Sequence, residues 1–157
     1  MSLYFFLKWL HVIGATILFG TGAGIAFFML RAHQTRDPRT IAAVASIVVL
    51  ADYVFTLSAV IAQPLTGVAL AHVAGYPLTS SWIVASLALY LFTGAFWVPV
   101  IFMQKKMRDL ARAAAEANAP LPDEYFQLYR RWFAFGIPAF FAVLAILWLM
   151  IARPTLT

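Results

Sequence analysis

The chain has 157 residues, of which 64% are hydrophobic and only 11% are charged, and its formal net charge is +5. A soluble domain is closer to half apolar and a quarter charged, so this composition argues against a water-soluble enzyme. The absence of cysteine excludes disulfides, thiol catalysis and Cys-ligated metal centres. Its basic residues gather in two clusters between long apolar runs, which is the pattern of a membrane protein.

Four segments are long and apolar enough to cross a bilayer, whose core of about 30 Å needs roughly 20 residues of helix. They cover residues 4–30, 41–70, 82–103 and 132–151. The sequence shows no pattern of strands, and in lipid only helices or closed barrels satisfy every backbone group. The predicted fold is therefore all-α, a four-transmembrane-helix bundle that forms one domain over residues 1–157.

Lysine and arginine predict the orientation, because they concentrate in cytoplasmic loops. Nine of the 11 basic residues lie in the predicted connections 31–40 and 104–131, and only Lys8 and Arg153 lie on the opposite side. We therefore expect a multi-pass protein of the bacterial inner membrane with both termini on the periplasmic side. The connection 104–131 is expected to start as a helical extension. Its basic residues are expected to face anionic lipid and not nucleic acid.

Ionisable groups inside a span are costly, so each one is a functional candidate. In the predicted spans they are Lys8, His11 and Asp52. At 100° per residue, the polar side chains of the first three spans fall on one face of each helix. These faces hold Lys8 and His11 on the first span; Asp52, Thr56, Gln63 and Thr66 on the second; and Ser86, Tyr90, Thr93, Trp97 and Gln104 on the third.

The rise of 1.5 Å per residue predicts the depth of these groups. His11, Gln63 and Tyr90 fall near one level in the outer half of the membrane, around a gap opposite a small residue of the fourth span. A second layer near the midplane is predicted to place Asp52 beside Thr93 and either Gly20 or Thr21. The pattern fits a polar lumen or a cofactor slot, and for the hydroxyls it also fits simple hydrogen bonding between helices.

His11 is a candidate ligand of haem or of a metal ion, since the small residues one turn away leave room for a flat macrocycle. A proton relay or a structural histidine bonded to a carbonyl is the alternative. Lys8 either reaches to the interface or pairs with an anionic group. His72 is a candidate second axial ligand. His33 lies too far along the helix to share an iron with His11, and we expect it to be solvated in a loop.

Asp52 is predicted near the membrane midplane, where a charged carboxylate costs more free energy than any other residue of the chain. Desolvation suits it to proton transfer, and a neutral carboxyl bonded to a threonine is the structural alternative. A second irregularity is expected at residues 63–67, where Pro64 removes a helix hydrogen bond and is predicted to kink the second span beside a cavity.

With these residues identified, the chain resembles a bacterial family of predicted integral membrane proteins known as domain of unknown function 2269. The likeness covers nearly the full length and brings no established activity. It rests on residues 7–12, 63–67, 97–100, 131–132, 136–139, 149–150 and Pro154.

The run Lys8-Trp9-Leu10-His11-Val12-Ile13, followed by Arg31 and His33 at the far end of the helix, is also similar to the first span of HemJ-type protoporphyrinogen oxidases. It also resembles the membrane region of copper-resistance D-type proteins. HemJ-type enzymes bind haem b and oxidise a porphyrinogen. The resemblance implies that His11 is an axial ligand and that Lys8 and Arg31 match functional basic positions. It covers about one helix, and this chain has no lysine between Lys8 and Lys105 to match the lysine-bearing later span of HemJ.

Three hypotheses follow. The leading one is a haem b protein, a candidate membrane oxidoreductase, that transfers electrons or oxidises a lipid-soluble substrate such as a quinol or porphyrinogen. His11 would hold the haem, and Asp52 would pass protons. The second is a small-ion transporter, copper-specific or proton-coupled. The third is a cofactor-free structural or assembly subunit, either of a homo-oligomer or of a larger membrane complex.

Overall fold

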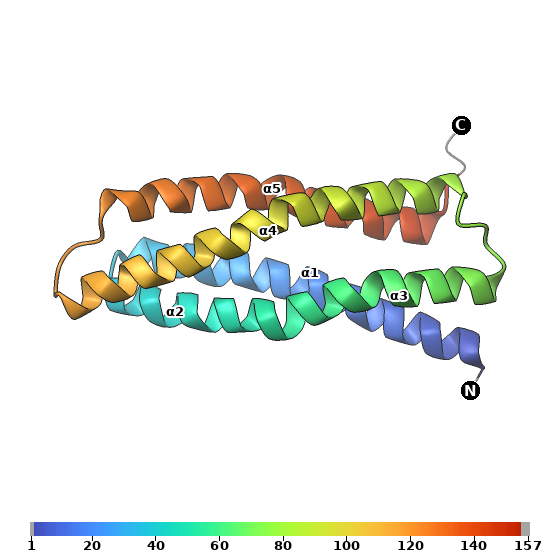
Figure 1. Ribbon diagram of the computed structural model, residues 1–157, viewed down its shortest axis with the longest axis horizontal. Coiled ribbons are helices and arrows are strands. Elements are labelled where there is room, and N and C mark those ends of the chain that lie inside the picture. The colour runs from blue at the N-terminus through green and yellow to red at the C-terminus, as the bar shows by residue number, and fades with distance from the viewer. Residues whose placement is uncertain (1, 155–157) are drawn as a thin grey trace.

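The computed structural model describes residues 2–154 and is all-α throughout them. Helix α1 is followed by three consecutive segments, α2, the π-helical turn η1 and α3, which join end to end into one rod of 37 residues. Two further helices, α4 and α5, complete the described chain (Figure 1). The bounds are Leu3–Thr35 for α1, Pro38–Ala51 for α2, Asp52–Thr56 for η1, Leu57–Ala74 for α3, Ser81–Glu116 for α4 and Asp123–Ala152 for α5.

Within residues 2–154, four rods of 30 to 37 residues are long and apolar enough to cross a membrane, which confirms the predicted fold class. At 1.5 Å per residue each rod exceeds the hydrocarbon core by several turns. Most of the predicted basic connection 104–131 is therefore helical. Helix α4 extends to Glu116 and α5 begins at Asp123, so that only a short loop separates the two helices. Pro122 occupies the N-cap position of α5.

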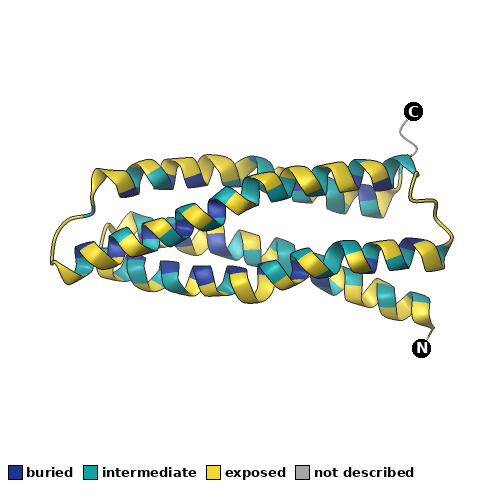
Figure 2. Ribbon diagram, in the orientation of Figure 1, coloured by how far each residue is buried: buried dark blue, intermediate teal, exposed yellow. Residues whose placement is uncertain are grey.

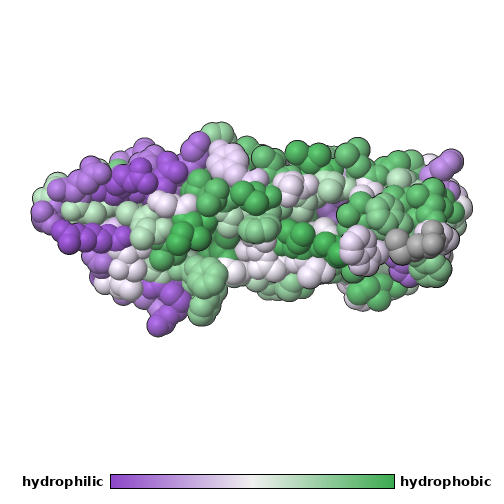
Figure 3. Space-filling model, turned by 90° about the horizontal axis from the view of Figure 1, so that it is seen from below, coloured by the Kyte–Doolittle hydropathy of each residue, from purple (hydrophilic) through white to green (hydrophobic). Residues whose placement is uncertain are grey.

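The rods run up and down, so the bundle has two different ends. The first and last described residues and the α3–α4 turn lie at one end, here called the terminal end (Figure 1). The α1–α2 and α4–α5 connections lie at the other, the basic end, where hydrophilic residues gather (Figure 3). Between the ends the outward surface is largely apolar, with side chains such as Leu91, Phe141 and Ile151 strongly exposed. A surface of this kind fits contact with lipid chains.

The hydrophobic core lies in the half of the bundle near the basic end. Buried residues from α1, α2, α4 and α5 form one cluster there (Figure 2), including Met29, Ile41, Met107, Tyr125 and Trp132. In the other half, α3 packs on α1 and α4 packs on α5, while α3 makes few contacts with α4 or α5. The terminal half is therefore two helix pairs in loose contact.

The irregular turn of the second rod lies at Asp52–Thr56 and not at the predicted position, residues 63–67. There the N–H of Leu57 bonds to the carbonyl of Asp52, five residues back, as in a π-bulge. Helix α3 continues through Pro64. The predicted interruption was wrong because a neighbouring helix, described below, supplies the hydrogen bond that proline removes.

A tight connection joins α1 to α2 at the basic end. Asp37 is the N-cap of α2, and its carboxylate accepts hydrogen bonds from the Thr40 hydroxyl at 2.6 Å and from the backbone N–H groups of Thr40 and Arg39. Pro38 follows at the first helical position, which suits its fixed φ. The hydrogen bonds from Thr40 lower the pKa of Asp37 below its usual value of 3.8.

This cap predicts a pH dependence of stability. A carboxyl whose pKa is lower in the folded state stabilises it fully above the unfolded pKa, and the effect disappears as the pH falls through the folded value. We expect the melting temperature of the wild type to exceed that of Asp37→Asn at pH 6, and the difference to narrow below about pH 4. Asparagine keeps the capping oxygen without the charge. A constant difference from pH 6 to pH 3 in thermal melts would contradict the assignment.

Candidate functional site

Two polar side chains hold α1 against α3 in the terminal half. The Nδ1 atom of His11 lies 2.9 Å from the hydroxyl oxygen of Thr66. One turn away, the side-chain amide of Gln63 donates to the backbone carbonyl of His11 at 2.8 Å. The predicted polar faces of the first two spans therefore meet at His11, Gln63 and Thr66, and the expected proximity of His11 and Gln63 is confirmed. The bond to Thr66 was not predicted.

Two glycines allow this close approach. The ring of His11 lies over Gly67, where an added Cβ would be 3.1 Å from the imidazole Cε1. A Cβ on Gly14 would overlap the amide nitrogen of Gln63. The polar pair and the glycines thus fit together as one unit, which we call the His11 cluster: His11, Gly14, Gln63, Thr66 and Gly67.

The hydrogen bonds of Thr66 favour one tautomer of His11. The hydroxyl of Thr66 donates its proton to the carbonyl of Ala62 at 2.8 Å, so its oxygen is left to accept a hydrogen bond. Nδ1 of His11 is then the protonated nitrogen, and Nε2 carries a lone pair. A neutral imidazole whose other N–H is held by a second group is the form that binds iron or other metals.

Tyr90 brings α4 to the same region. Its hydroxyl donates to the carbonyl of Val60 at 2.7 Å. In a regular helix this carbonyl would accept from residue 64, which is Pro64 and has no N–H. Tyr90 therefore replaces the bond that proline removes and keeps α3 continuous. Tyr90 was predicted to lie at the level of Gln63, and its hydroxyl contacts Val60, which is one helical turn from Gln63.

The carboxyl of Asp52 lies apart from the His11 cluster, at the π-helical turn. Asp52 is only 4% exposed, and its side chain faces those of Thr56, Trp97 and Gln104. The expected neighbours Thr93 and Gly20 or Thr21 were the wrong partners, because small errors in helix ends and the π-turn shift the register. Among the described residues, Thr56 Oγ1, Trp97 Nε1 and Gln104 Oε1 are buried without completing a hydrogen bond.

A cavity of about 170 Å³ adjoins this carboxyl, and Asp52 and Trp97 line it. The other lining residues are apolar or aromatic, and Tyr53, Val98 and Phe102 among them are exposed on the outer surface of the bundle. The cavity therefore joins a buried carboxyl to the surface that faces lipid. Its chemistry suits the polar head of a lipid-soluble molecule.

Three predicted site residues lie outside both clusters. Lys8 is exposed, with its ammonium 5.7 Å from the centre of the Tyr4 ring. His72 is exposed in the last turn of α3. Arg31 is exposed near the basic end and donates to Gln34 at 2.8 Å, which places it 20 residues, or about 30 Å, along α1 from His11. The structure brings none of them into contact with the His11 ring.

Soft-metal transport needs clustered ligands. Within residues 2–154, no three residues of the kinds His, Cys, Asp and Glu are grouped so that they could hold a metal ion. Within these residues the copper hypothesis is therefore without a ligand cluster.

Four apolar rods of membrane length in the described chain, with an apolar outer surface, define a polytopic helical membrane protein. The chain belongs to the family described as "Predicted integral membrane protein (DUF2269)", which matches residues 5–154. No curated protein and no solved structure matches it. The family assignment predicted from the sequence is confirmed.

Proposed function

We propose that this protein is a haem b-binding membrane protein of the bacterial inner membrane that exchanges electrons with a lipid-soluble substrate such as a quinol. The observation that carries the proposal is the position of His11: the hydroxyl of Thr66 lies 2.9 Å from its Nδ1, and its ring lies over Gly67, which has no side chain. A ring oriented in this way would hold the haem iron through its second nitrogen.

Packing around His11 supports the same proposal. The two helix pairs of the terminal half are in loose contact, and the buried residues of this half include Gly14, Ala59 and Ala142, which are small. Small residues allow a flat ring to approach helix backbones. Haem b, when bound, supplies one-electron chemistry, while Thr66 and Gln63 orient the imidazole that holds it. His72 remains the candidate for a second ligand.

Asp52 is proposed to handle the protons. Oxidation of a quinol releases two electrons and two protons, and haem b accepts one electron at a time. The quinol would therefore be oxidised in two successive one-electron steps, with the haem reoxidised by an external electron acceptor between them. Each step releases one proton, so a base close to the substrate hydroxyl is required. An ionised Asp52 can take one proton from a hydroxyl that enters its cavity from the lipid side. Trp97 lines the same cavity, and its indole N–H, which faces the carboxyl, can donate to the substrate oxygen.

The test is a reduced-minus-oxidised absorbance spectrum of the protein purified in detergent from cells supplied with haem. We expect Soret and α bands in the wild type, their loss in His11→Ala, and a ten- to a hundredfold weaker haem affinity in Thr66→Val, which removes the supporting acceptor. His33→Ala is the matched control, since His33 lies at the basic end, and it should retain the bands.

The same sample tests the substrate. A short-chain quinol should reduce the haem of the wild type and act more slowly on Asp52→Asn. A wild type without haem bands would end the haem proposal and favour the structural or assembly role. Haem bands that survive His11→Ala would contradict the ligand assignment.

A further inference from the structure

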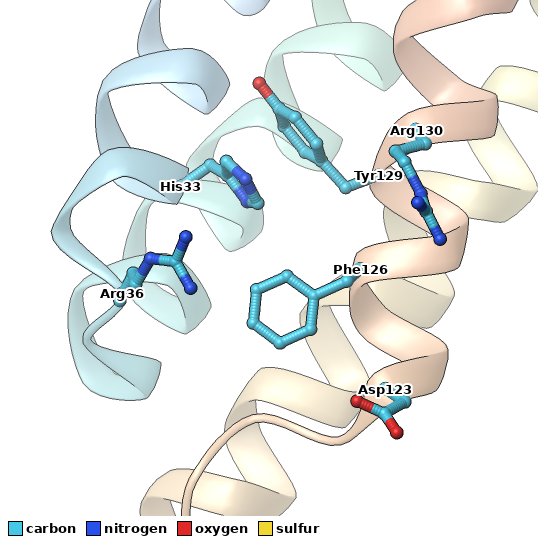
Figure 4. A pocket seen from close by; sticks show the side chains of 6 residues that line it. All are labelled: His33, Arg36, Asp123, Phe126, Tyr129 and Arg130. Carbon is cyan, nitrogen blue, oxygen red and sulfur yellow. The ribbon is translucent and has the colours of Figure 1, made fainter.

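A second pocket lies at the basic end, between the last turn of α1 and the first turns of α5. Its volume is about 430 Å³ (Figure 4). Neither the His11 cluster nor the Asp52 cavity contributes to it. The lining residues are His33, Arg36, Asp123, Phe126, Tyr129 and Arg130.

Packed aromatic rings line one side of this pocket. His33 stacks in parallel on Tyr129, with ring centres 3.5 Å apart, and its Nδ1 lies 3.3 Å from the hydroxyl of Tyr125. The expectation of a solvated loop histidine was wrong, because the helix continues past His33 and packs this ring on α5. Tyr129 is only 8% exposed, and its hydroxyl has no hydrogen-bond partner in the described part of the chain.

The two arginines of the pocket differ from most basic residues around them. Across residues 2–154, the side chains of Arg36 and Arg130 make no hydrogen bond or ion pair; Arg36 only places its guanidinium 5.7 Å from the centre of the Phe126 ring. Lys105, which donates to the Tyr53 hydroxyl, and five other basic residues at this end have polar partners, whereas Arg131, outside the pocket, has none in the described part of the chain. These pairs are Arg31 with Gln34, Arg39 with Asn118, Arg112 with Ser46, Lys106 with Glu124, and Arg108 with Asp109.

Arg36 also has an unusual backbone. Its φ is 54°, in the left-handed region, where a residue with a side chain is disfavoured by about 1 kcal/mol. Glycine would fit this helix C-cap without strain. An arginine here fixes a guanidinium at the mouth of the pocket, facing Phe126 (Figure 4).

We propose that this pocket binds the phosphate group of an anionic membrane lipid. Guanidinium groups bind phosphate through paired hydrogen bonds, and Arg36 and Arg130 have their donors available. The carboxylate of Asp123 repels an anion in this pocket. The positive end of the α5 helix dipole lies at the same place and offsets this repulsion. Phe133, one turn beyond Arg130 and exposed, continues the apolar surface along which acyl chains can lie.

The test measures lipid binding to the whole protein in detergent by native mass spectrometry, with phosphatidylglycerol and phosphatidylcholine of the same chains. We expect the wild type to bind phosphatidylglycerol in preference. The double variant Arg36→Gln/Arg130→Gln should lose at least tenfold in affinity. The control Arg31→Gln/Arg112→Gln removes the same charge at the same end, outside the pocket, and should stay within twofold of the wild type.

Equal losses in both double variants would overturn the site, because they would indicate diffuse attraction to a basic surface. Equal binding of the two lipids by the wild type would overturn it as well. Inorganic phosphate provides the remaining arm: if it binds to the wild type and phosphatidylglycerol does not displace it, the lipid assignment is wrong. Helix content from circular dichroism identifies any variant that fails to fold.

Discussion

Substituting Gly14 by alanine is expected to destabilise the protein by about 1–3 kcal/mol, although alanine is the better helix former. The added methyl group would overlap the amide nitrogen of Gln63, so that this side chain must move. Its hydrogen bond to the carbonyl of His11 would then be lost, at a net cost of about 1 kcal/mol. Thermal melts in detergent should show a lower melting temperature, by about 3–10 °C.

The chain offers a matched control on the same helix. A Cβ on Gly20 meets no atom within 4 Å, so Gly20→Ala should be neutral or slightly stabilising, by up to about 1 kcal/mol of helix propensity. A second comparison isolates the overlap itself. In a Gln63→Ala background the obstructing amide is absent, and adding Gly14→Ala should cause no further loss. Equal losses from Gly14→Ala in both backgrounds would show that another contact is responsible.

The sequence predicted the features that depend on helical periodicity, but not those that depend on the exact register between helices. Hydropathy and helical spacing predicted the four rods, and the same spacing predicted that His11 and Gln63 face each other. Both depend only on a repeat of 3.6 residues, which a chain of apolar helices makes visible. Partners of Asp52 were predicted wrongly, because the π-turn at Asp52–Thr56 rotates the rest of the rod and has no clear sequence signature.

Two other differences have physical causes of the same kind. His33 was expected in a loop, since the apolar run ends near residue 30, yet α1 continues for more than a turn into the region outside the apolar span. Its aromatic partners Tyr125 and Tyr129 lie about 90 positions away in the sequence, beyond the reach of any local pattern. Pro64 was expected to break a helix because the residue that compensates for it lies on another helix.

That compensation can be measured. Replacing Tyr90 by phenylalanine leaves the carbonyl of Val60 without a donor in an apolar environment, where an unsatisfied polar group costs about 1–3 kcal/mol. In the Pro64→Ala background the new N–H of residue 64 can donate to the same carbonyl, as in a regular helix. Tyr90→Phe should then cost less by about 1–2 kcal/mol. The two substitutions form a double-mutant cycle with a coupling free energy of that size.

The control for this cycle is Tyr53→Phe. Tyr53 is 47% exposed, and its hydroxyl accepts only a long hydrogen bond from Lys105 at 3.4 Å, so its removal should change stability by less than about 0.5 kcal/mol in either background. A Tyr90→Phe effect that is the same with Pro64 and with alanine at that position would mean that the tyrosine acts through packing alone. The cycle therefore distinguishes a helix held straight by a neighbouring hydroxyl from one that tolerates its proline unaided.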